Sequence, residues 1–182
     1  MSRGPCPLGV VHGRFQPFHN EHLLYLRLAA ARCEQLIVGI TNPEPGSSGL
    51  EPTDTRRHLP DENPYSYWQR LRVVDAVLKA DGLTGSIVPF PISEPEKIRH
   101  YVPAEATHFL RVFDQWGEEK VRRLEAQGCH VVVLDPGAVK TLTASTVRSL
   151  MREGGKWQEL VPPAAARVLE TFHDETGRRC PT

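Results

Sequence analysis

Residues 12–22 read His-Gly-Arg-Phe-Gln-Pro-Phe-His-Asn-Glu-His, between a short apolar run at 8–11 and a segment with helical periodicity. A glycine at such a strand-to-helix turn allows the backbone to turn tightly. The amides at the N-terminus of the following helix favour an anion. The stretch therefore predicts an α/β fold whose first turn holds a phosphate group.

The rest of the chain alternates between the same two kinds of segment. Apolar runs predict further strands at residues 35–41, 86–92, 107–113 and 130–134. Periodic segments predict helices at residues 22–33, 65–79, 94–101, 118–127, 145–152 and 162–173. This order predicts a Rossmann-like fold, an open parallel five-stranded sheet with flanking helices and a C-terminal helical segment. Ligands in such sheets bind at the carboxyl ends of the strands.

Length and composition are those of one folded domain. Of the 182 residues, 40% are hydrophobic and 24% are charged, so residues 1–182 are predicted to form a single domain. Within it, residues 42–63 form a long polar loop insertion and residues 153–182 a helical extension. The 22 basic and 22 acidic residues balance. This balance argues against nucleic acid or a membrane as the partner.

Cysteine usage points to a reducing compartment. Cys6, Cys33, Cys129 and Cys180 stand far apart and form no CxxC pair, which argues against zinc-ribbon and thioredoxin-type sites. No secretory signal or membrane span is recognisable. The sequence therefore predicts a cytoplasmic protein with free thiols.

Two histidines mark the first turn of the first predicted helix. His19 and His22 are three residues apart, so they lie on one face of that turn. Two imidazoles beside a phosphate can hydrogen-bond its oxygens and neutralise charge on a leaving group. Two other interpretations are metal ligands and surface residues. No third ligand is identifiable, so no metal site is predicted.

Residues 13–22 resemble the (H/T)xGH signature of the nucleotidyltransferase superfamily, in its archaeal nicotinamide-mononucleotide adenylyltransferase-like branch. Residues 142–148, Leu-Thr-Ala-Ser-Thr-Val-Arg, are similar to the second motif of that branch, which opens a helix and grips the triphosphate. Residues 62–66 and 155–162 resemble further segments of it. The combined pattern looks more like the cytidylyltransferases that activate phosphonates such as phosphonoformate.

The resemblance implies that an anionic acceptor oxygen attacks the α-phosphorus of a nucleoside triphosphate and that pyrophosphate leaves. Because the acceptor is already ionised, no general base is needed. The catalytic residues implied are His19, His22, Arg14 and Arg148. The nucleotide-binding residues implied are Gly13, Arg14, Phe15, Gln16, His19, His22, Asp135, Leu142, Ser145, Thr146 and Arg148. Mg²⁺ is the implied cofactor, held mainly by the triphosphate rather than by protein ligands.

Three departures from the branch bear on the acceptor. Glu21 stands where the signature has glycine, residues 111–117 replace a Tyr-Ser-Gly-Asn-like stretch, and the loop at 42–63 is longer. A small, strongly anionic acceptor fits these changes, with CTP as the expected donor. The acceptor-binding residues expected are Arg14, Arg56, Arg57, Arg111, Asp114 and Trp116. For Asp114, a loop-capping role is an equal alternative.

Two other functions stay open at this point. One is nicotinamide-mononucleotide adenylyl transfer from ATP. The other is a non-catalytic nucleotide sensor, since a fold does not determine function. The choice between CTP and ATP stays open, as does that between a monomer and a homo-oligomer.

Overall fold

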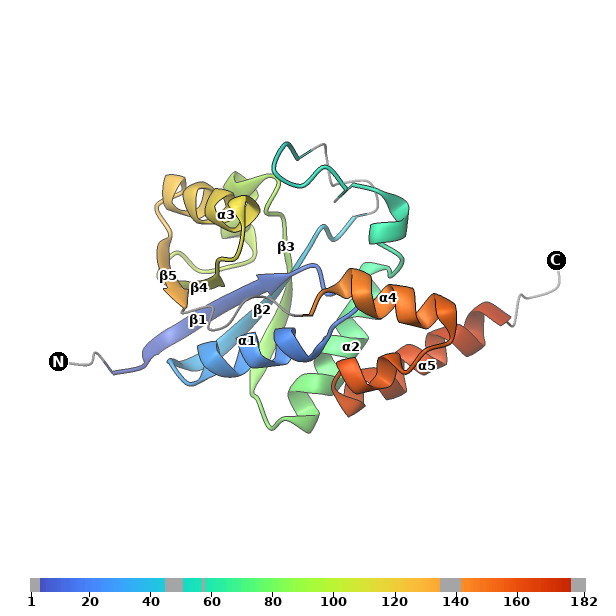
Figure 1. The fold of residues 1–182 in the computed structure, drawn as a ribbon. Helices are drawn as coiled ribbons and strands as arrows, with labels where there is room; N and C mark the ends of the chain where they lie inside the picture. Colours follow the sequence, from blue (N-terminus) through green and yellow to red (C-terminus); the bar gives the residue numbers. More distant parts are fainter. Residues whose placement is uncertain (1–3, 45–50, 57, 135–141, 178–182) are drawn as a thin grey trace.

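In the computed structural model, residues 4–44, 51–56, 58–134 and 142–177 are described, with side chains up to residue 172. Within these residues, five parallel strands form one sheet in the order β3-β2-β1-β4-β5 (Figure 1). Their bounds are Cys6–Gly13 for β1, Cys33–Thr41 for β2, Gly85–Phe90 for β3, Thr107–Arg111 for β4 and His130–Leu134 for β5. The chain runs outward from β1 in one direction and then returns to build β4 and β5 on the other side. The predicted Rossmann-like parallel sheet is confirmed.

Helices cover both faces of this sheet. The α-helices are α1 (Asn20–Ala30), α2 (Tyr67–Ala80), α3 (Gln115–Ala126), α4 (Ala144–Glu153) and α5 (Pro163–Gly177). Short 3-10 helices are η1 (Pro60–Glu62), η2 (Pro95–His100) and η3 (Trp157–Leu160). In Figure 1, α1, α2 and α5 lie below the sheet, α4 lies to its right and α3 lies above it.

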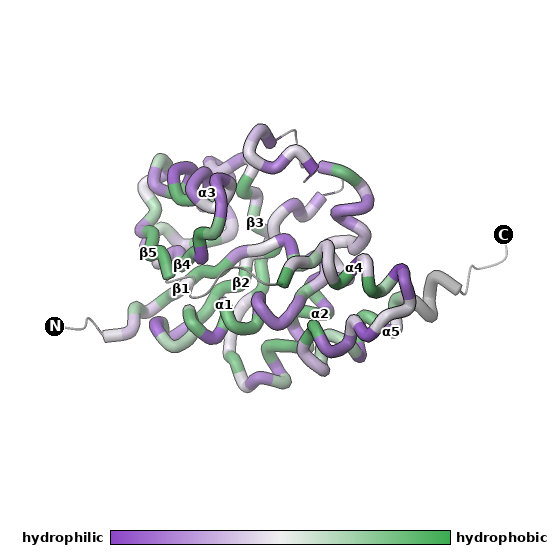
Figure 2. The backbone as a smooth tube through the Cα atoms, viewed as in Figure 1, coloured by the Kyte–Doolittle hydropathy of each residue, from purple (hydrophilic) through white to green (hydrophobic). Residues whose placement is uncertain are grey.

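Each face of the sheet has its own apolar core, because successive residues of a strand point to opposite faces. In β1, Val11 belongs to the cluster that includes α1, α2 and α5. Its neighbour Val10 belongs to the cluster that includes η2 and α3. Figure 2 shows hydrophobic colour along the central strands and mixed colour on the helices. The inner strands are thus buried on both faces, as their continuous apolar runs predict.

The pairing between β1 and β4 is much shorter than the others. Only Gly9 with Thr107 and Val10 with His108 are paired there. By contrast, β1 pairs with β2 from Cys6 to Gly13. Beyond Val10, the carboxyl ends of β1 and β4 are therefore not paired with each other.

Some element boundaries differ from the predicted ones. Helix α1 begins at Asn20 rather than at residue 22, because His19 adopts extended backbone as its N-cap. Helix α2 begins at Tyr67 rather than at residue 65, because Ser66 caps it by accepting a hydrogen bond from the Gln69 amide (3.2 Å). The C-terminal segment holds two elements, η3 and α5, and α5 packs its alanines and Phe172 into the core with α2.

Arg70 fastens helix α2 to the ends of β1 and β2. Its buried guanidinium donates hydrogen bonds to the carbonyls of Arg14 (3.0 Å), Thr41 (2.6 Å) and Asn42 (2.7 Å). Phe15 and Asn42 both have positive φ, 53° and 51°, which is uncommon outside glycine. Arg70 therefore holds both unusual turns in place, and burial lowers its pKa to about 10.

The segment before η1 is attached to helix α3. Glu51 is buried and binds Arg123 through both carboxylate oxygens, at 2.9 and 2.8 Å. Such a bidentate pair gives a defined geometry. The guanidinium of Arg123 also lies 5.1 Å from the centre of the Trp116 ring. This segment passes above the carboxyl ends of the strands, between α3 and α4 (Figure 1).

Candidate active site

A pocket of about 410 Å³ opens at the carboxyl ends of the strands, where β1 and β4 diverge. This is the point at which the chain reverses its direction across the sheet, and ligands of open α/β sheets bind there. Half of the residues that line the pocket are predicted site residues: Gly13, Arg14, Phe15, Gln16, His19, His22, Arg56, Arg111, Asp114, Trp116 and Ser145.

The turn after β1 is held in place by aromatic side chains. Phe15 and Phe18 are buried in the core, with ring centres 5.2 Å apart. A Cβ at position 13 would lie only 2.8 Å from the ring of Phe15. Gly13 is therefore required because the ring packs directly on its backbone. This packing brings the start of α1 to the pocket.

His19 and His22 lie against each other at the start of α1. Their rings are stacked with centroids 3.7 Å apart. The backbone N–H of His19 donates to Nδ1 of His22 (3.2 Å). When the His22 ring is neutral, its proton is therefore on Nε2, so this nitrogen is the donor. Both rings line the pocket beside the N-terminal amides of α1.

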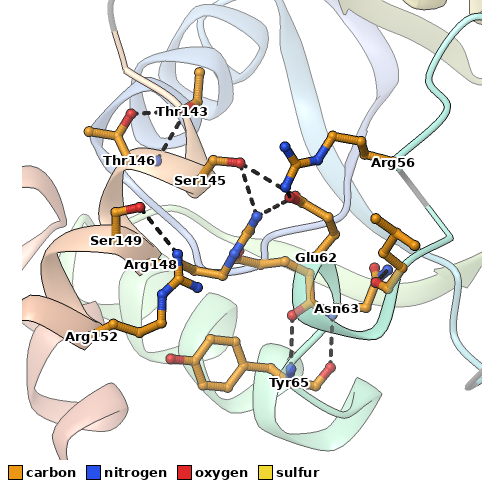
Figure 3. A network of polar contacts seen from close by, with 12 residues as sticks. Arg56, Glu62, Asn63, Tyr65, Thr143, Ser145, Thr146, Arg148, Ser149 and Arg152 are labelled. Carbon is orange, nitrogen blue, oxygen red and sulfur yellow. Dashed lines mark hydrogen bonds and ion pairs between the residues drawn. The ribbon is translucent and has the colours of Figure 1, made fainter.

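The N-terminal turn of α4 forms a second wall, drawn in Figure 3. Thr143 caps the helix by accepting from the Thr146 amide (3.2 Å). Arg148 is buried and donates to the carbonyl of Gln16 (2.5 Å), to the Ser145 hydroxyl (3.0 Å) and to the carboxylate of Glu62. Arg148 therefore connects α4 with the β1–α1 turn and with η1.

Arg14 lies among these charges. Burial lowers its pKa, while the carboxylates of Asp54 and Glu62 act in the opposite direction and Arg148 lowers it further. Arg56, whose side chain is 75% exposed, contacts Glu62 at 3.2 Å. This end of the pocket is therefore lined by two arginines and two carboxylates, with Arg148 buried behind them.

At the other end of the pocket, Glu21 contacts Arg111. The two side chains form an ion pair of 2.7 Å between the first turn of α1 and the end of β4. The guanidinium of Arg111 also lies 4.8 Å from the centre of the Phe113 ring. The carboxylate at the position of the signature glycine thus points across the divergence of β1 and β4.

Asp114 and Trp116 have structural contacts as well as their places in the pocket. The carboxylate of Asp114 accepts from the Gly117 amide (2.8 Å) and caps α3, so the capping interpretation holds. Trp116 belongs to the first turn of α3 and is buried in the core, with Arg123 beside its ring.

A family model described as cytidylyltransferase-like matches residues 10–170. The chain belongs to the cytidylyltransferase-like family. The predicted membership in the nucleotidyltransferase superfamily and the predicted enzyme class are confirmed.

Several known proteins resemble this family member. It is 44% identical to phosphonoformate cytidylyltransferase of Streptomyces viridochromogenes, over 89% of this chain and 90% of that one. It is 31% identical to nicotinamide-nucleotide adenylyltransferase of Saccharolobus solfataricus, over 98% and 96% of the two chains. The solved bifunctional NMN adenylyltransferase/ADP ribose pyrophosphatase of Francisella tularensis superposes with a TM-score of 0.66 at 17% identity. The match covers 92% of this chain and 50% of that one, and at this identity it shows the shared fold.

Some predicted site residues of this cytidylyltransferase-like chain do not line the pocket. Leu142 packs against the core, and Arg148 lies behind Ser145. Thr146 faces outward beside Thr143, the N-cap of α4. Arg57 and Asp135 lie outside the described residues. The roles of all predicted site residues stay predictions.

Three residues that were not among the predicted site residues shape this site. Glu62 binds Arg148, Glu21 binds Arg111, and Arg70 supports the backbone of Arg14. The acidic residue at the start of the Glu-Asn-Pro segment could have predicted the role of Glu62. The arginine inside an apolar helix face at position 70 was a second usable signal.

The described residues contain no group of three or more His, Cys, Asp or Glu side chains suited to a metal ion. In the pocket, Glu62 and Glu21 bind arginines and Asp114 caps a helix. No helix in the described part of the chain is long and apolar enough to cross a membrane.

Proposed function

We propose that the protein transfers CMP from CTP to a small, strongly anionic phosphonate and releases pyrophosphate. The observation that carries this proposal is the 44% identity to phosphonoformate cytidylyltransferase along nearly the whole chain. The pocket supports it, since one cavity holds Arg14, Arg56 and Arg111 around a histidine pair. Such a cavity suits two anionic reactants.

In the proposed reaction, an acceptor oxygen forms a bond to the α-phosphorus of CTP as the bond from that phosphorus to the β-phosphate oxygen breaks. The pyrophosphate takes the electron pair of the broken bond. His19 and His22 would hydrogen-bond the phosphates and stabilise the charge that builds on them. Ser145 and Arg148 would bind the departing phosphates at the N-terminus of α4. Catalysis then consists of positioning and charge stabilisation.

A divalent cation, proposed as Mg²⁺, would reach the site bound to the triphosphate. The donor set fits this arrangement, because three of the four pocket carboxylates, Glu62, Glu21 and Asp114, already bind protein groups. The cation would reduce the negative charge of the triphosphate. We also propose a cytoplasmic location, since the cysteines that the structure describes are free thiols.

We propose that Arg14, Arg56 and Arg111 bind the acceptor. All three line the same pocket, although Arg56 contacts Glu62 and Arg111 contacts Glu21. A compact acceptor with several negative charges needs several cations. Arg111→Ala should therefore raise the KM for the acceptor and leave the Kd for CTP unchanged. Arg122→Ala is the matched control, because Arg122 is exposed on α3 and pairs with its neighbour Glu119.

The decisive experiment compares kcat/KM for CTP plus phosphonoformate with kcat/KM for ATP plus nicotinamide mononucleotide, both by pyrophosphate release. We expect the first pair to be strongly preferred. Preference for the second pair would make the protein a nicotinamide-nucleotide adenylyltransferase, the candidate that the 31% identical relative favours. Binding of nucleotide without turnover of any pair would indicate a sensor.

A further inference from the structure

Glu62 places a buried carboxylate inside the cationic end of the pocket. Its side chain is 9% exposed and accepts hydrogen bonds or an ion pair from three groups, Arg148, Ser145 (3.4 Å) and Arg56 (3.2 Å) (Figure 3). Two of these groups stand at the N-terminal turn of α4, where the helix dipole favours an anion. The carboxylate thus has the surroundings that a phosphate oxygen would have.

The backbone around Glu62 is held firmly. The amide of Asn63 donates to the carbonyl of Pro60 (2.8 Å), which closes η1. The side chain of Gln16 pairs with both backbone groups of Tyr65, at 2.8 and 2.9 Å. The carbonyl of Gln16 also accepts from Arg148. The carboxylate and the arginine are therefore fixed relative to the same turn, so their contact belongs to the fold.

The donors of Arg148 are largely occupied in this arrangement. A guanidinium has five N–H groups. Those of Arg148 reach the Gln16 carbonyl, the Ser145 hydroxyl and Glu62. A phosphate that binds Arg148 through two parallel hydrogen bonds must therefore take over the place of the Glu62 carboxylate.

We propose that Glu62 is an internal anion that competes with the phosphates of the nucleotide and of pyrophosphate for Arg148, Arg56 and Ser145. This inference rests on the proposed function, which places phosphates at this end of the pocket. In the empty site, Glu62 keeps the buried Arg148 paired. During turnover it lowers the affinity for pyrophosphate and so promotes release of that product.

The test is the binding of inorganic pyrophosphate, with Mg²⁺ present, to wild type and to Glu62→Gln by calorimetry. The glutamine amide keeps the size of the side chain and an oxygen acceptor for Arg148, and it removes the negative charge. The Kd for pyrophosphate should fall by about tenfold, because a like charge a few ångströms away is lost. Pyrophosphate should also become a stronger product inhibitor.

Glu51→Gln is the matched control. Glu51 is a second buried, arginine-paired carboxylate of the same segment, and it does not line the pocket. Its Kd for pyrophosphate should equal that of wild type. In an Arg148→Ala background, Glu62→Gln should increase the affinity for pyrophosphate by a smaller factor, because Glu62 acts partly through its competition for Arg148.

An equal or weaker affinity in Glu62→Gln would overturn the inference while wild-type binding of CTP and pyrophosphate still supports the proposed function. If wild type binds neither, the proposed function fails and the inference falls with it. Should Glu62→Gln not fold, wild type labelled with ¹³C at its glutamate carboxyl carbons answers the question. Pyrophosphate should shift the signal of Glu62 and leave that of Glu51 in place, and an unmoved Glu62 signal would contradict the inference.

Discussion

His19 and His22 act as one unit, because their stacked rings limit each other's rotation. The hydrogen bond from the His19 amide to Nδ1 of His22 adds a second link between the two residues. The arrangement holds the donor nitrogens at one place beside the helix N-terminus. In the proposed reaction, each ring would thus contribute to phosphate binding both directly and through its neighbour.

His19→Ala and His22→Ala should each lower kcat by about 10²–10³, the usual cost of losing one donor to a developing charge. The double variant should lose less than the product of the two, since each ring orients the other. Pyrophosphate-release kinetics measure both effects. His100→Ala, which removes an exposed histidine of η2, should behave as wild type. Activity within a few-fold of wild type in both single variants would exclude the assigned role.

Arg148→Ala should weaken the binding of CTP, because Arg148 and Ser145 stand together at the N-terminus of α4. We expect a Kd at least about tenfold higher by calorimetry. Arg148→Lys should not restore binding, since an ammonium lacks the planar fork. Arg152→Ala is the control, because Arg152 is exposed on the same helix and contacts Ser149 (Figure 3). An unchanged Kd in Arg148→Ala would contradict the role.

At the level of elements, the site depends on how α2 meets the strand ends. Arg70 bonds carbonyls at the ends of β1 and β2 and the carbonyl of Ser66 on its own helix. No carboxylate is among the partners that the structure gives for it. A buried guanidinium with only carbonyl acceptors depends on all of them, which makes this residue hard to replace.

Arg70→Lys should lower the free energy of unfolding by on the order of 3 kcal/mol, because one ammonium cannot satisfy carbonyls in several directions. It should also lower kcat, since the backbone of Arg14 loses its support. Thermal unfolding and turnover measure the two effects. Arg32→Lys, which changes an exposed arginine bonded to the Leu28 carbonyl, should change neither. An unchanged melting temperature in Arg70→Lys would show that the hydrogen bonds from Arg70 to the strand ends are dispensable.

The elements themselves were predictable, whereas the contacts between their ends were not. The inner strands are buried on both faces, so their sequences are continuous apolar runs. The glycine-aromatic turn at residues 13–18 marked the position of the pocket. The pairs Glu21–Arg111 and Glu62–Arg148 join residues 90 and 86 positions apart. Their meeting depends on the crossovers that bring β4 beside β1 and α4 beside η1, and no local pattern records it.

At the scale of the whole molecule, one buried histidine links stability to pH. His108 lies on β4 against Phe90 and is 2% exposed, and its Nδ1 has no hydrogen-bond partner among the described residues. Burial, and to a smaller extent Arg99, lowers its pKa to about 4. The folded protein therefore keeps this ring neutral at pH values where the unfolded chain takes up a proton.

The free energy of unfolding should thus fall as the pH drops from the unfolded pKa of about 6.5 towards 4, by up to about 3 kcal/mol from this residue. Above that window the contribution is constant. Chemical unfolding of wild type and His108→Leu at pH 7 and pH 5 tests it. The variant should lose less stability on acidification, whereas His100→Ala should behave as wild type. Equal pH dependence in His108→Leu would refute the assignment.

The short pairing between β1 and β4 creates a seam, a weakly paired junction between two parts of the sheet. Two residue pairs join the strands, and side-chain contacts from Glu21 to Arg111, Glu51 to Arg123 and Tyr25 to the Phe109 carbonyl add to them. Units so joined open separately, so amide hydrogens of β4 and β5 should exchange with deuterium faster than those of β1 and β2. A bound nucleotide that spans the seam should slow this exchange most on the β4 side. Bound substrate would then hold the two halves of the molecule together mechanically.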